Sequence, residues 1–433
     1  MKKIAKLGSL AVALAMTAEL SGLSSVANAA TQTKKVAAPI NLVMTIWGSQ
    51  SLDLPTYQLR ANLYTKSHPN VHISVKLLQN YDQQVETMIA GGEQVDIMEV
   101  AQEAIGFGKQ GAVLNLAPYI KASKLNMKQQ FIPGYIGTYS YRGAQYAIPE
   151  RGGFMVMYYN KSMFKKAGLP FPNAKWTWSE FLKDAQKLTI RQGGTTTQWG
   201  VALDNWWPKF GSFVHQNGGH MLNANMTAST VNTPATMQAL QFYQDLQYKY
   251  HVSPNAIDMA NMGNGANVDA MFANQQTAMM TTGLWDIQPF KQARVNFGIA
   301  PLPLGKAGGG MEAVGTGLAI SAKSKYPKVA FDVIKFLTSG PGEKLIVTNK
   351  EDIPASREAT KLWVKTLPKG VVTPSDWNAM LNEVFSPRIP PTWNNWQNVM
   401  YNDLTDFFNG KNTLKANADK LAADAPAVLA GNP

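Results

Sequence analysis

Two residue types suited to binding flat, polyhydroxylated molecules recur near expected loop starts of this 433-residue chain. Indole rings offer apolar faces, and carboxylates accept hydrogen bonds from hydroxyl groups. Sugars combine apolar C–H faces with hydroxyl-rich edges, so this mixture is typical of a carbohydrate site. We predict ligand contacts from the following residues: Trp47, Glu103, Glu150, Asp204, Trp206, Trp285, Asp286 and Trp393.

Each of these residues also has a purely structural interpretation. A tryptophan in a Pro-rich turn often packs as a wedge between elements. Glu150 is followed by Arg151, so an ion pair at a hinge is the alternative for Glu150. Asp286 can cap a turn, and Asp53 can cap the helix expected at Pro55, so Asp53 is left out of the predicted site. The prediction therefore requires that these side chains lie close together in the folded protein.

The segment 147–189 is expected to lie at the centre of the fold. A polar, Gly-rich loop at 150–153 is expected before an apolar strand at 154–159. Thr177 and Glu180 have capping-box spacing, in which each side chain satisfies a free backbone N–H at the start of a helix. The apolar positions that follow recur at helical spacing: Phe181, Leu182, Ala185 and Leu188.

Other segments alternate between strand and helix patterns. The third expected strand, 95–100, would deliver Glu103 to its carboxyl end, where open α/β sheets place ligands. A loop flanked by glycines is expected at 308–317. The expected strands are 40–46, 71–77, 95–100, 199–203, 295–303 and 318–321, and expected helices begin near Pro55, Pro234, Pro327 and Trp396.

Length and composition favour a two-domain globular protein. The chain is longer than a single hydrophobic core usually grows. Its hydrophobic content of 45% and charged content of 16% are globular values. The absence of cysteine excludes disulfides, thiol catalysis and Cys-ligated metal sites.

The first residues have the pattern of an export signal. Three lysines precede a short apolar run at 10–18, and Ala27 and Ala29 place small residues at the two positions that signal peptidase reads. We expect residues 1–29 to be removed after Ala29. A membrane anchor is the poorer alternative, because the run is too short to cross a bilayer and Glu19 ends it.

The chain is basic, but its positive charges are dispersed. The net charge is +12, and the signal contributes three lysines and one glutamate, so +10 remains after its removal. The sequence contains no run of four basic residues and no basic block interleaved with aromatic residues. Nucleic-acid binding is therefore not expected.

Three segments resemble the extracellular solute-binding proteins of family 1, the sugar-binding subunits of ABC importers. They are YYNKSMFKKAGL followed by WTWSEF at 158–181, GAVLNLAPYI at 111–120 and MFANQQTAMMTTGLW at 271–285. Leu23 follows Leu20-Ser21-Gly22 where relatives often carry a lipid-modified cysteine.

The resemblance implies a periplasmic-binding-protein-like α/β fold with two lobes, a multi-segment hinge and a ligand cleft between the lobes. We expect residues 30–148 and 300–338 in the N-lobe, and 149–299 and 339–433 in the C-lobe, with a further crossing at 339–342. It also implies an exported monomer that needs no cofactor and delivers a carbohydrate to membrane permease subunits. Trp285 and Trp393 fall where such proteins place stacking aromatics, and Glu103, Glu150 and Asp204 fall in loops that supply polar contacts.

Two other functions stay open from the residues alone. A glycoside hydrolase needs two carboxylates around one bond, and the acids of the predicted site could supply a pair, although no local signature fixes one. A basic adhesin for anionic wall polymers would also suit the net charge. No His-Glu-x-x-His, phosphate-binding loop or Gly-x-Ser-x-Gly motif is present.

Overall fold

The computed structural model describes residues 38–263, 266–349 and 352–431. The chain divides into two units, residues 1–38 and 39–433. The expected signal segment 1–29 lies outside the described residues. Everything that follows concerns the second unit.

The larger sheet has a parallel centre and an antiparallel side. Its order is β13-β12-β3-β1-β2, and β6 also pairs with β12. Strand β1 is parallel to both β2 and β3, whereas β12 is antiparallel to β3 and β6. The bounds are β1 Ile40–Ile46, β2 Val71–Leu77, β3 Ile97–Val100, β6 Ile148–Phe154, β12 Met311–Ile320 and β13 Val384–Phe385.

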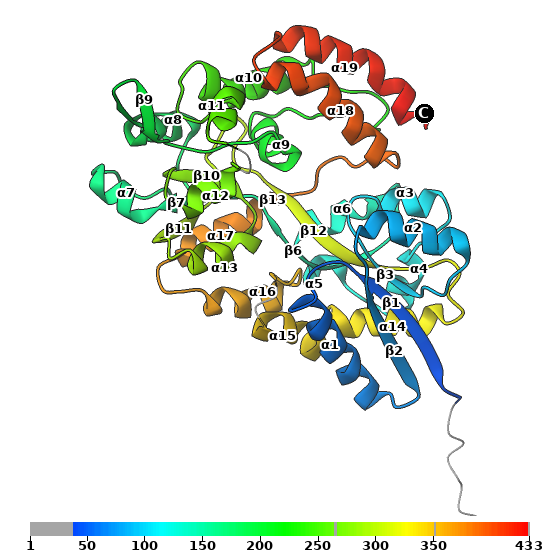
Figure 1. Ribbon diagram of the computed structural model, residues 1–433. Helices are drawn as coiled ribbons and strands as arrows, with labels where there is room; N and C mark the ends of the chain where they lie inside the picture. Colours follow the sequence, from blue (N-terminus) through cyan, green and yellow to red (C-terminus); the bar gives the residue numbers. More distant parts are fainter. Residues whose placement is uncertain (1–37, 264–265, 350–351, 432–433) are drawn as a thin grey trace, which may run out of the picture. The chain divides into compact units, whose positions relative to one another are not determined.

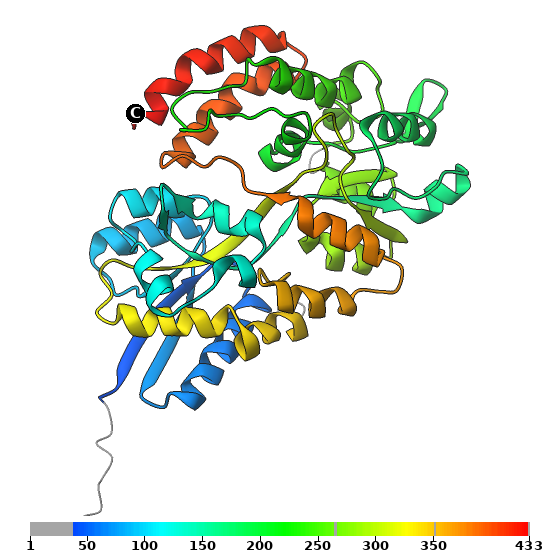
Figure 2. The ribbon, with the colours of Figure 1, turned by 180° about the vertical axis from the view of Figure 1, so that it is seen from behind.

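Helices cover both faces of this sheet. Helices α1 and α14 lie on one side, and α2 and α3 lie on the other (Figures 1 and 2). The helices and small strands around this sheet are α1 Asp53–Ser67, α2 Tyr81–Gly91, α3 Ala104–Lys109, α4 Ala117–Ala122, α5 Met127–Gln130, α6 Pro133–Thr138, β4 Ser140–Tyr141, β5 Ala144–Gln145, α14 Pro327–Leu337, α15 Gly340–Asn349, α16 Arg357–Trp363 and η2 Val364–Thr366. Apolar side chains of the sheet are thereby removed from water on both sides.

A smaller antiparallel sheet has the order β10-β7-β11. Its central strand carries Tyr158, whose hydroxyl donates to the carbonyl of Gly283 at 2.9 Å and whose ring packs against Phe272 and Phe290. The elements around it are β7 Val156–Asn160, α7 Lys161–Lys166, α8 Trp178–Leu188, β8 Ile190–Gln192, β9 Thr195–Gln198, α11 Ala256–Asn261, α12 Val268–Ala273, β10 Met279–Thr282, η1 Leu284–Asp286, α13 Ile287–Gln292, β11 Phe297–Ala300 and α17 Pro374–Glu383.

Four helices pack together beside the smaller sheet: α9 Trp207–Gln216, α10 Pro234–Tyr248, α18 Trp393–Phe408 and α19 Leu414–Leu429. Helix α18 packs along α19, and α9 packs along α10 (Figure 1). The expected start of α8 is confirmed, because Thr177 and Glu180 form the capping box. The helices expected at Pro234 and Pro327 are confirmed as well.

The segment 150–153 is a buried strand, so the loop expected there is wrong. Strand β6 includes these residues and pairs with β12 along 313–318. Gly152 and Gly315 allow this close pairing, because a Cβ atom on Gly152 would lie 2.2 Å from the Cα atom of Gly315. The loop expected at 308–317 is likewise mostly strand, since β12 begins at Met311.

Strands β6 and β12 of the larger sheet run side by side and extend towards the smaller sheet (Figure 1). Strand β7 begins two residues after β6 ends, so β6 leads directly into the smaller sheet. Residues 340–342, within the stretch expected to form a further crossing, belong to α15, which packs against α1 and α14. Residues 199–203 form only isolated bridges with 277 and 280 rather than a strand. The β6–β12 pair thus joins the two sheets, and a second connection runs from α17, which packs against β11, into β13 of the larger sheet.

Candidate functional site

The centre of the candidate site is a pair of half-buried indole rings. Trp206 immediately precedes α9, and Trp285 lies in the short turn η1 after β10. Their ring centroids are 5.9 Å apart with an interplanar angle of 68°. Gly283 lets the Trp285 ring lie against the backbone, because a Cβ atom there would come within 2.1 Å of the ring. The pair therefore presents two aromatic surfaces from segments far apart in the sequence.

Acidic side chains flank this pair. The Asp204 carboxylate accepts the backbone N–H of Trp206 at 3.0 Å and pairs with the Lys209 ammonium group at 2.6 Å. Lys209 is almost fully buried, whereas the Asp204 side chain stays 41% exposed. Asp204 is thus held in place on one side and open to solvent on the other.

Asp286 adjoins Trp285 and is partly buried. Burial raises the pKa of Asp286 to about 6, and a 2.6 Å hydrogen bond from the Thr282 hydroxyl opposes this rise. Asp269 and Lys209 also act on it electrostatically. A carboxyl group with this pKa changes charge in a mildly acidic medium, so its hydrogen-bonding capacity depends on pH.

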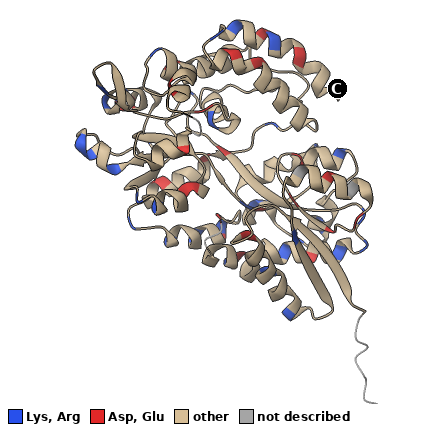
Figure 3. Cartoon of the chain, viewed as in Figure 1, with Lys and Arg blue, Asp and Glu red and all other residues tan. Residues whose placement is uncertain are grey.

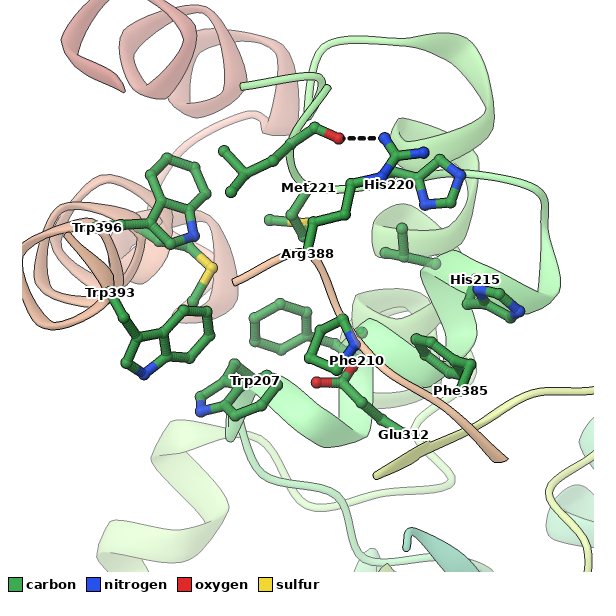
Figure 4. A pocket seen from close by; sticks show the side chains of 16 residues that line it. Trp207, Phe210, His215, His220, Met221, Glu312, Phe385, Arg388, Trp393 and Trp396 are labelled. Carbon is green, nitrogen blue, oxygen red and sulfur yellow. Dashed lines mark hydrogen bonds between the residues drawn. The ribbon is translucent and has the colours of Figure 1, made fainter. Parts of the chain in front are cut away.

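Trp393 lies near these groups but in a separate aromatic pocket. It is the first residue of α18, and its ring meets the Trp207 ring edge to face at 4.9 Å. Figure 4 shows Trp207, Trp393 and Trp396 on one side of this pocket, with Phe210 at its centre. Because Trp207 follows Trp206 in the chain, the aromatic pocket adjoins the Trp206–Trp285 pair.

Glu312 lines the same pocket and was not predicted from the sequence. The residue is 2% exposed, and its Oε1 atom has no hydrogen-bond partner among the described residues. Burial raises the pKa of Glu312 well above its usual range. The sequence held one signal, an acidic residue within an otherwise apolar run at 311–320, but that run was divided between a loop and a strand.

Two predicted residues lie at the larger sheet instead. Trp47 directly follows β1, donates its backbone N–H to Glu99 at 3.0 Å and packs edge to face on Tyr81 at 4.9 Å. Glu103 precedes α3 and accepts the backbone N–H of Ala101 at 2.7 Å. Strands β1 and β3 are parallel, so both residues are at the carboxyl edge of the sheet, as the sequence predicts.

Glu150 is not available to a ligand in this structure. Its side chain is fully buried and pairs with Arg60 at 2.5 Å, while the Tyr57 hydroxyl donates to it at 2.6 Å. Arg151 lies 3.6 Å from it and also pairs with Glu99. The geometry favours the alternative interpretation, in which Glu150 and Arg151 form structural ion pairs on β6.

Asp53, left out of the predicted site, belongs to the same charged cluster. Its carboxylate lies 3.2 Å from an Arg151 nitrogen and accepts the backbone N–H of Ser49 at 2.5 Å. The cluster therefore joins α1, β3 and β6. In Figure 3 the positions of Lys, Arg, Asp and Glu are otherwise dispersed along the chain, in keeping with the dispersed charge of the sequence.

Contacts bring four of the eight predicted residues into one group, namely Asp204, Trp206, Trp285 and Asp286, with Trp393 in the adjoining pocket. Trp47 and Glu103 remain with the larger sheet. Among the described residues, no three His, Asp or Glu side chains gather in a way that could hold a metal ion. None of the helices in the described parts of the chain is long and apolar enough to cross a membrane.

Two α/β sheets joined by a strand pair, with aromatic and acidic side chains presented from loops, define a two-lobed α/β binding fold. The sequence profile described as "Bacterial extracellular solute-binding protein" matches residues 48–344, more than half of the chain. The chain belongs to this family.

Named relatives share this family pattern at low identity. The "Multiple sugar-binding protein" of Streptococcus mutans is 26% identical over 299 residues, covering 64% of this chain and 66% of the relative. The "Arabinooligosaccharide-binding protein" of Halalkalibacterium halodurans is 24% identical over 305 residues, covering 67% of this chain and 58% of the relative.

The fold matches solved structures over most of the chain. An ABC substrate-binding protein from Listeria monocytogenes, solved in complex with cycloalternan, superposes with a TM-score of 0.76 at 22% identity. The match covers 91% of this chain and 100% of the Listeria chain. At this identity the likeness concerns the fold.

Proposed function

We propose that this protein captures a carbohydrate outside the cytoplasm and delivers it to the permease of an ABC importer. The observation that carries the proposal is the Trp206–Trp285 pair flanked by Asp204 and Asp286. Indole faces stack on sugar C–H surfaces, and the carboxyl groups bind hydroxyls at the sugar edge. The sugar-binding names of the relatives support the same ligand class.

The proposed contact set is smaller than the set predicted from the sequence. Asp204, Trp206, Trp285 and Asp286 form its centre, and Trp393 extends it into the adjoining pocket. Trp47 and Glu103 would approach from the larger sheet when the two lobes close. Glu150 is excluded because its carboxylate is buried and already paired.

We further propose that closure bends the β6–β12 connection. The lobe boundaries expected from the sequence remain a proposal, with one adjustment that the contacts favour. Helix α15 packs against α1, and Arg60 donates to the carbonyl of Gly342 at 3.0 Å. Residues 340–349 therefore go with the N-lobe in the proposed division.

The protein would bind its ligand without changing it chemically, because the named relatives are binding proteins. Export, with removal of residues 1–29, is proposed from the signal pattern together with the extracellular family. We propose that the protein acts as a monomer and uses no cofactor.

Titration calorimetry against a panel of mono- and oligosaccharides tests the proposal. We expect one class to bind with micromolar or tighter affinity, and Trp285→Ala to weaken that binding by at least about 30-fold, as expected for a central aromatic contact. Trp178→Ala is the matched control: Trp178 is also half-buried but stacks on Phe242 at 4.6 Å, outside the proposed contact set.

The proposal fails if no carbohydrate binds the unaltered protein. Equal affinity of the Trp285→Ala variant and the unaltered protein would refute the site assignment while leaving the ligand class intact. Release of shorter sugars during incubation would instead indicate a glycoside hydrolase.

A further inference from the structure

Glu312 is a buried acidic side chain without a charged or hydrogen-bonding partner for Oε1. It lies on β12, and no Lys, Arg or His forms an ion pair with it in the described parts of the chain. An ionised carboxylate in such a place would lose its hydration without compensation, so burial favours the uncharged form of Glu312. A buried carboxyl group with an unpartnered oxygen lowers the free energy of unfolding, and such groups in folded proteins often have a functional role.

The charged neighbours of the pocket are directed elsewhere. Arg388 donates to the carbonyl of Leu222 at 2.5 Å, and Figure 4 shows its guanidinium group beside His220, away from Glu312. Burial, with smaller effects of His220 and Arg388, lowers the pKa of His215 to about 4, so His215 is neutral at pH 7. Tyr401 of α18 accepts the backbone N–H of Trp207 at 3.0 Å, and its pKa is raised to about 12, mainly by burial, so it is uncharged as well.

A glycine in a neighbouring helix leaves space for the Glu312 carboxyl group. Gly211 lies within α9, and a Cβ atom there would come within 2.4 Å of Oε2 of Glu312. Glycine inside a helix costs roughly 0.5–1 kcal/mol relative to alanine. At this position the glycine makes room for the carboxyl group at the edge of the pocket.

The pocket suits a small polar fragment between aromatic walls. Its volume is about 50 Å³, which is room for a few water molecules. Pockets that enclose drug-sized ligands measure roughly 300–1,000 Å³. In Figure 4 the Glu312 carboxyl group points into this space beside Trp207 and Phe210. A hydroxymethyl arm fits such a space, whereas a complete sugar ring does not.

We propose that this pocket is a subsite for a neutral, hydroxyl-bearing part of the ligand, and that the Glu312 side chain hydrogen-bonds that hydroxyl. An uncharged carboxyl group has one donor and further acceptors, and a hydroxyl group has the same complement, so the two satisfy each other. The inference rests on the proposed carbohydrate function, because the pocket adjoins Trp206 and includes Trp393.

Two substitutions of Glu312 separate ligand binding from a structural role. Glu312→Gln keeps a donor and an acceptor, and we expect its Kd for the best oligosaccharide to stay within about threefold. Glu312→Met keeps the approximate size but no strong hydrogen-bonding group, and we expect a Kd roughly tenfold weaker. Glu312→Met should melt at a higher temperature than the unaltered protein, because an unpartnered buried polar group is removed, whereas Glu312→Gln should melt at nearly the same temperature.

Glu343→Met is the matched control. Glu343 is also buried, but its carboxylate accepts two hydrogen bonds from Ser356 at 3.0 and 2.5 Å. This variant should melt at a lower temperature with an unchanged Kd. A Glu312→Met variant that behaves in the same way would overturn the proposal.

Calorimetry in two buffers of different ionisation enthalpy tests the charge of the ligand group. A hydroxyl group should bind at pH 7 without proton release. Release of close to one proton to the buffer would mean that a cationic ligand group stabilises the ionised Glu312 carboxylate, which contradicts a neutral ligand part.

Crystals soaked in glycerol test the subsite without the oligosaccharide. We expect a glycerol hydroxyl within hydrogen-bond distance of the Glu312 carboxyl group in the unaltered protein and none in Glu312→Met. An unoccupied pocket in both crystals would refute the subsite. If glycerol binds but no carbohydrate does, the proposed function fails and the subsite stands.

Discussion

Arg60 and Glu150 form an ion pair in which both side chains are fully buried. Arg60 also donates to the carbonyls of Leu337 and Gly342, at the end of α14 and the start of α15. A buried pair adds little over an apolar pair, but loss of one partner leaves an uncompensated charge. The pair is therefore expected to matter most when only one member is removed.

Arg60→Met should lower the free energy of unfolding by about 3–5 kcal/mol, because Glu150 would remain buried with only the more distant Arg151, at 3.6 Å, as its cation. Adding Glu150→Gln to this variant should recover part of the loss, since the stranded charge is then gone. Urea denaturation of both single variants and the double variant measures the coupling. A loss below about 1 kcal/mol for Arg60→Met would contradict the buried pair.

Glu343 makes stability depend on pH in a defined direction. Burial raises the pKa of Glu343 from 4.5 to about 7, and hydrogen bonds from Ser356 oppose the rise. Between about pH 4.5 and 7 the unfolded chain releases this proton while the folded chain keeps it. The contribution of Glu343 to the free energy of unfolding therefore falls as the pH rises through this window.

Glu343→Gln should accordingly gain stability over the unaltered protein as the pH rises, by about 3 kcal/mol at most. Urea denaturation at pH 4.5 and 7.5 measures this difference, and other titrating groups cancel in the comparison. A difference that is independent of pH would show that Glu343 ionises normally in the folded protein.

At the level of elements, the pairing of β6 with β12 depends on close backbone approach. Gly152 has a φ of 134°, and a Cβ atom there would lie 2.2 Å from the backbone of Gly315. Gly152→Ala should therefore cost more than about 3 kcal/mol, because strain and a backbone clash act together.

Gly111→Ala is the control for backbone strain alone. Gly111 has a φ of 75°, but a Cβ atom added there would meet no other part of the chain within 4 Å. We expect it to cost about 1 kcal/mol. Thermal and urea unfolding of both variants measures the difference, and equal losses would mean that the strand pair tolerates a side chain at 152.

The sequence predicted elements well where local signals agree. The capping box at Thr177 and Glu180 and the proline starts at Pro234 and Pro327 locate their helices. The strand at 150–153 was missed because its polar and glycine residues are typical of a loop. Only long-range contacts, the β12 pairing and the Arg60 and Tyr57 partners of Glu150, make this segment a buried strand.

At the level of the whole molecule, the sequence indicates which residue types could bind a ligand. It does not indicate which of these residues lie close together in the folded protein. Trp206 and Trp285 meet because the segment before α9 lies along β10, where Ala202 bridges to Met280, and no local pattern encodes this contact. The assignment of Glu150 to the ligand failed for the converse reason, since burial and its partners depend on α1. Glu312 was missed because an acidic residue in a strand has no local signature until its surroundings are known.

Ligand-driven closure of the two lobes involves the whole molecule. The two sheets are joined by β6 and β12, and predicted contacts lie on both, with Trp47 and Glu103 at the larger sheet. A ligand that touches both sides binds a closed form more tightly than an open one, so it shifts the population towards closure. Saturation with the best oligosaccharide should therefore reduce the radius of gyration in small-angle X-ray scattering.

The same ligand at 100 times its Kd should raise the free energy of unfolding by about 2.7 kcal/mol. The double variant Trp206→Ala/Trp285→Ala, at the same sugar concentration, should show neither compaction nor stabilisation. Calorimetric binding without any change in the radius of gyration would contradict closure, because the ligand would then contact one side only. Compaction that persists in the double variant would instead place the ligand away from the Trp206–Trp285 pair.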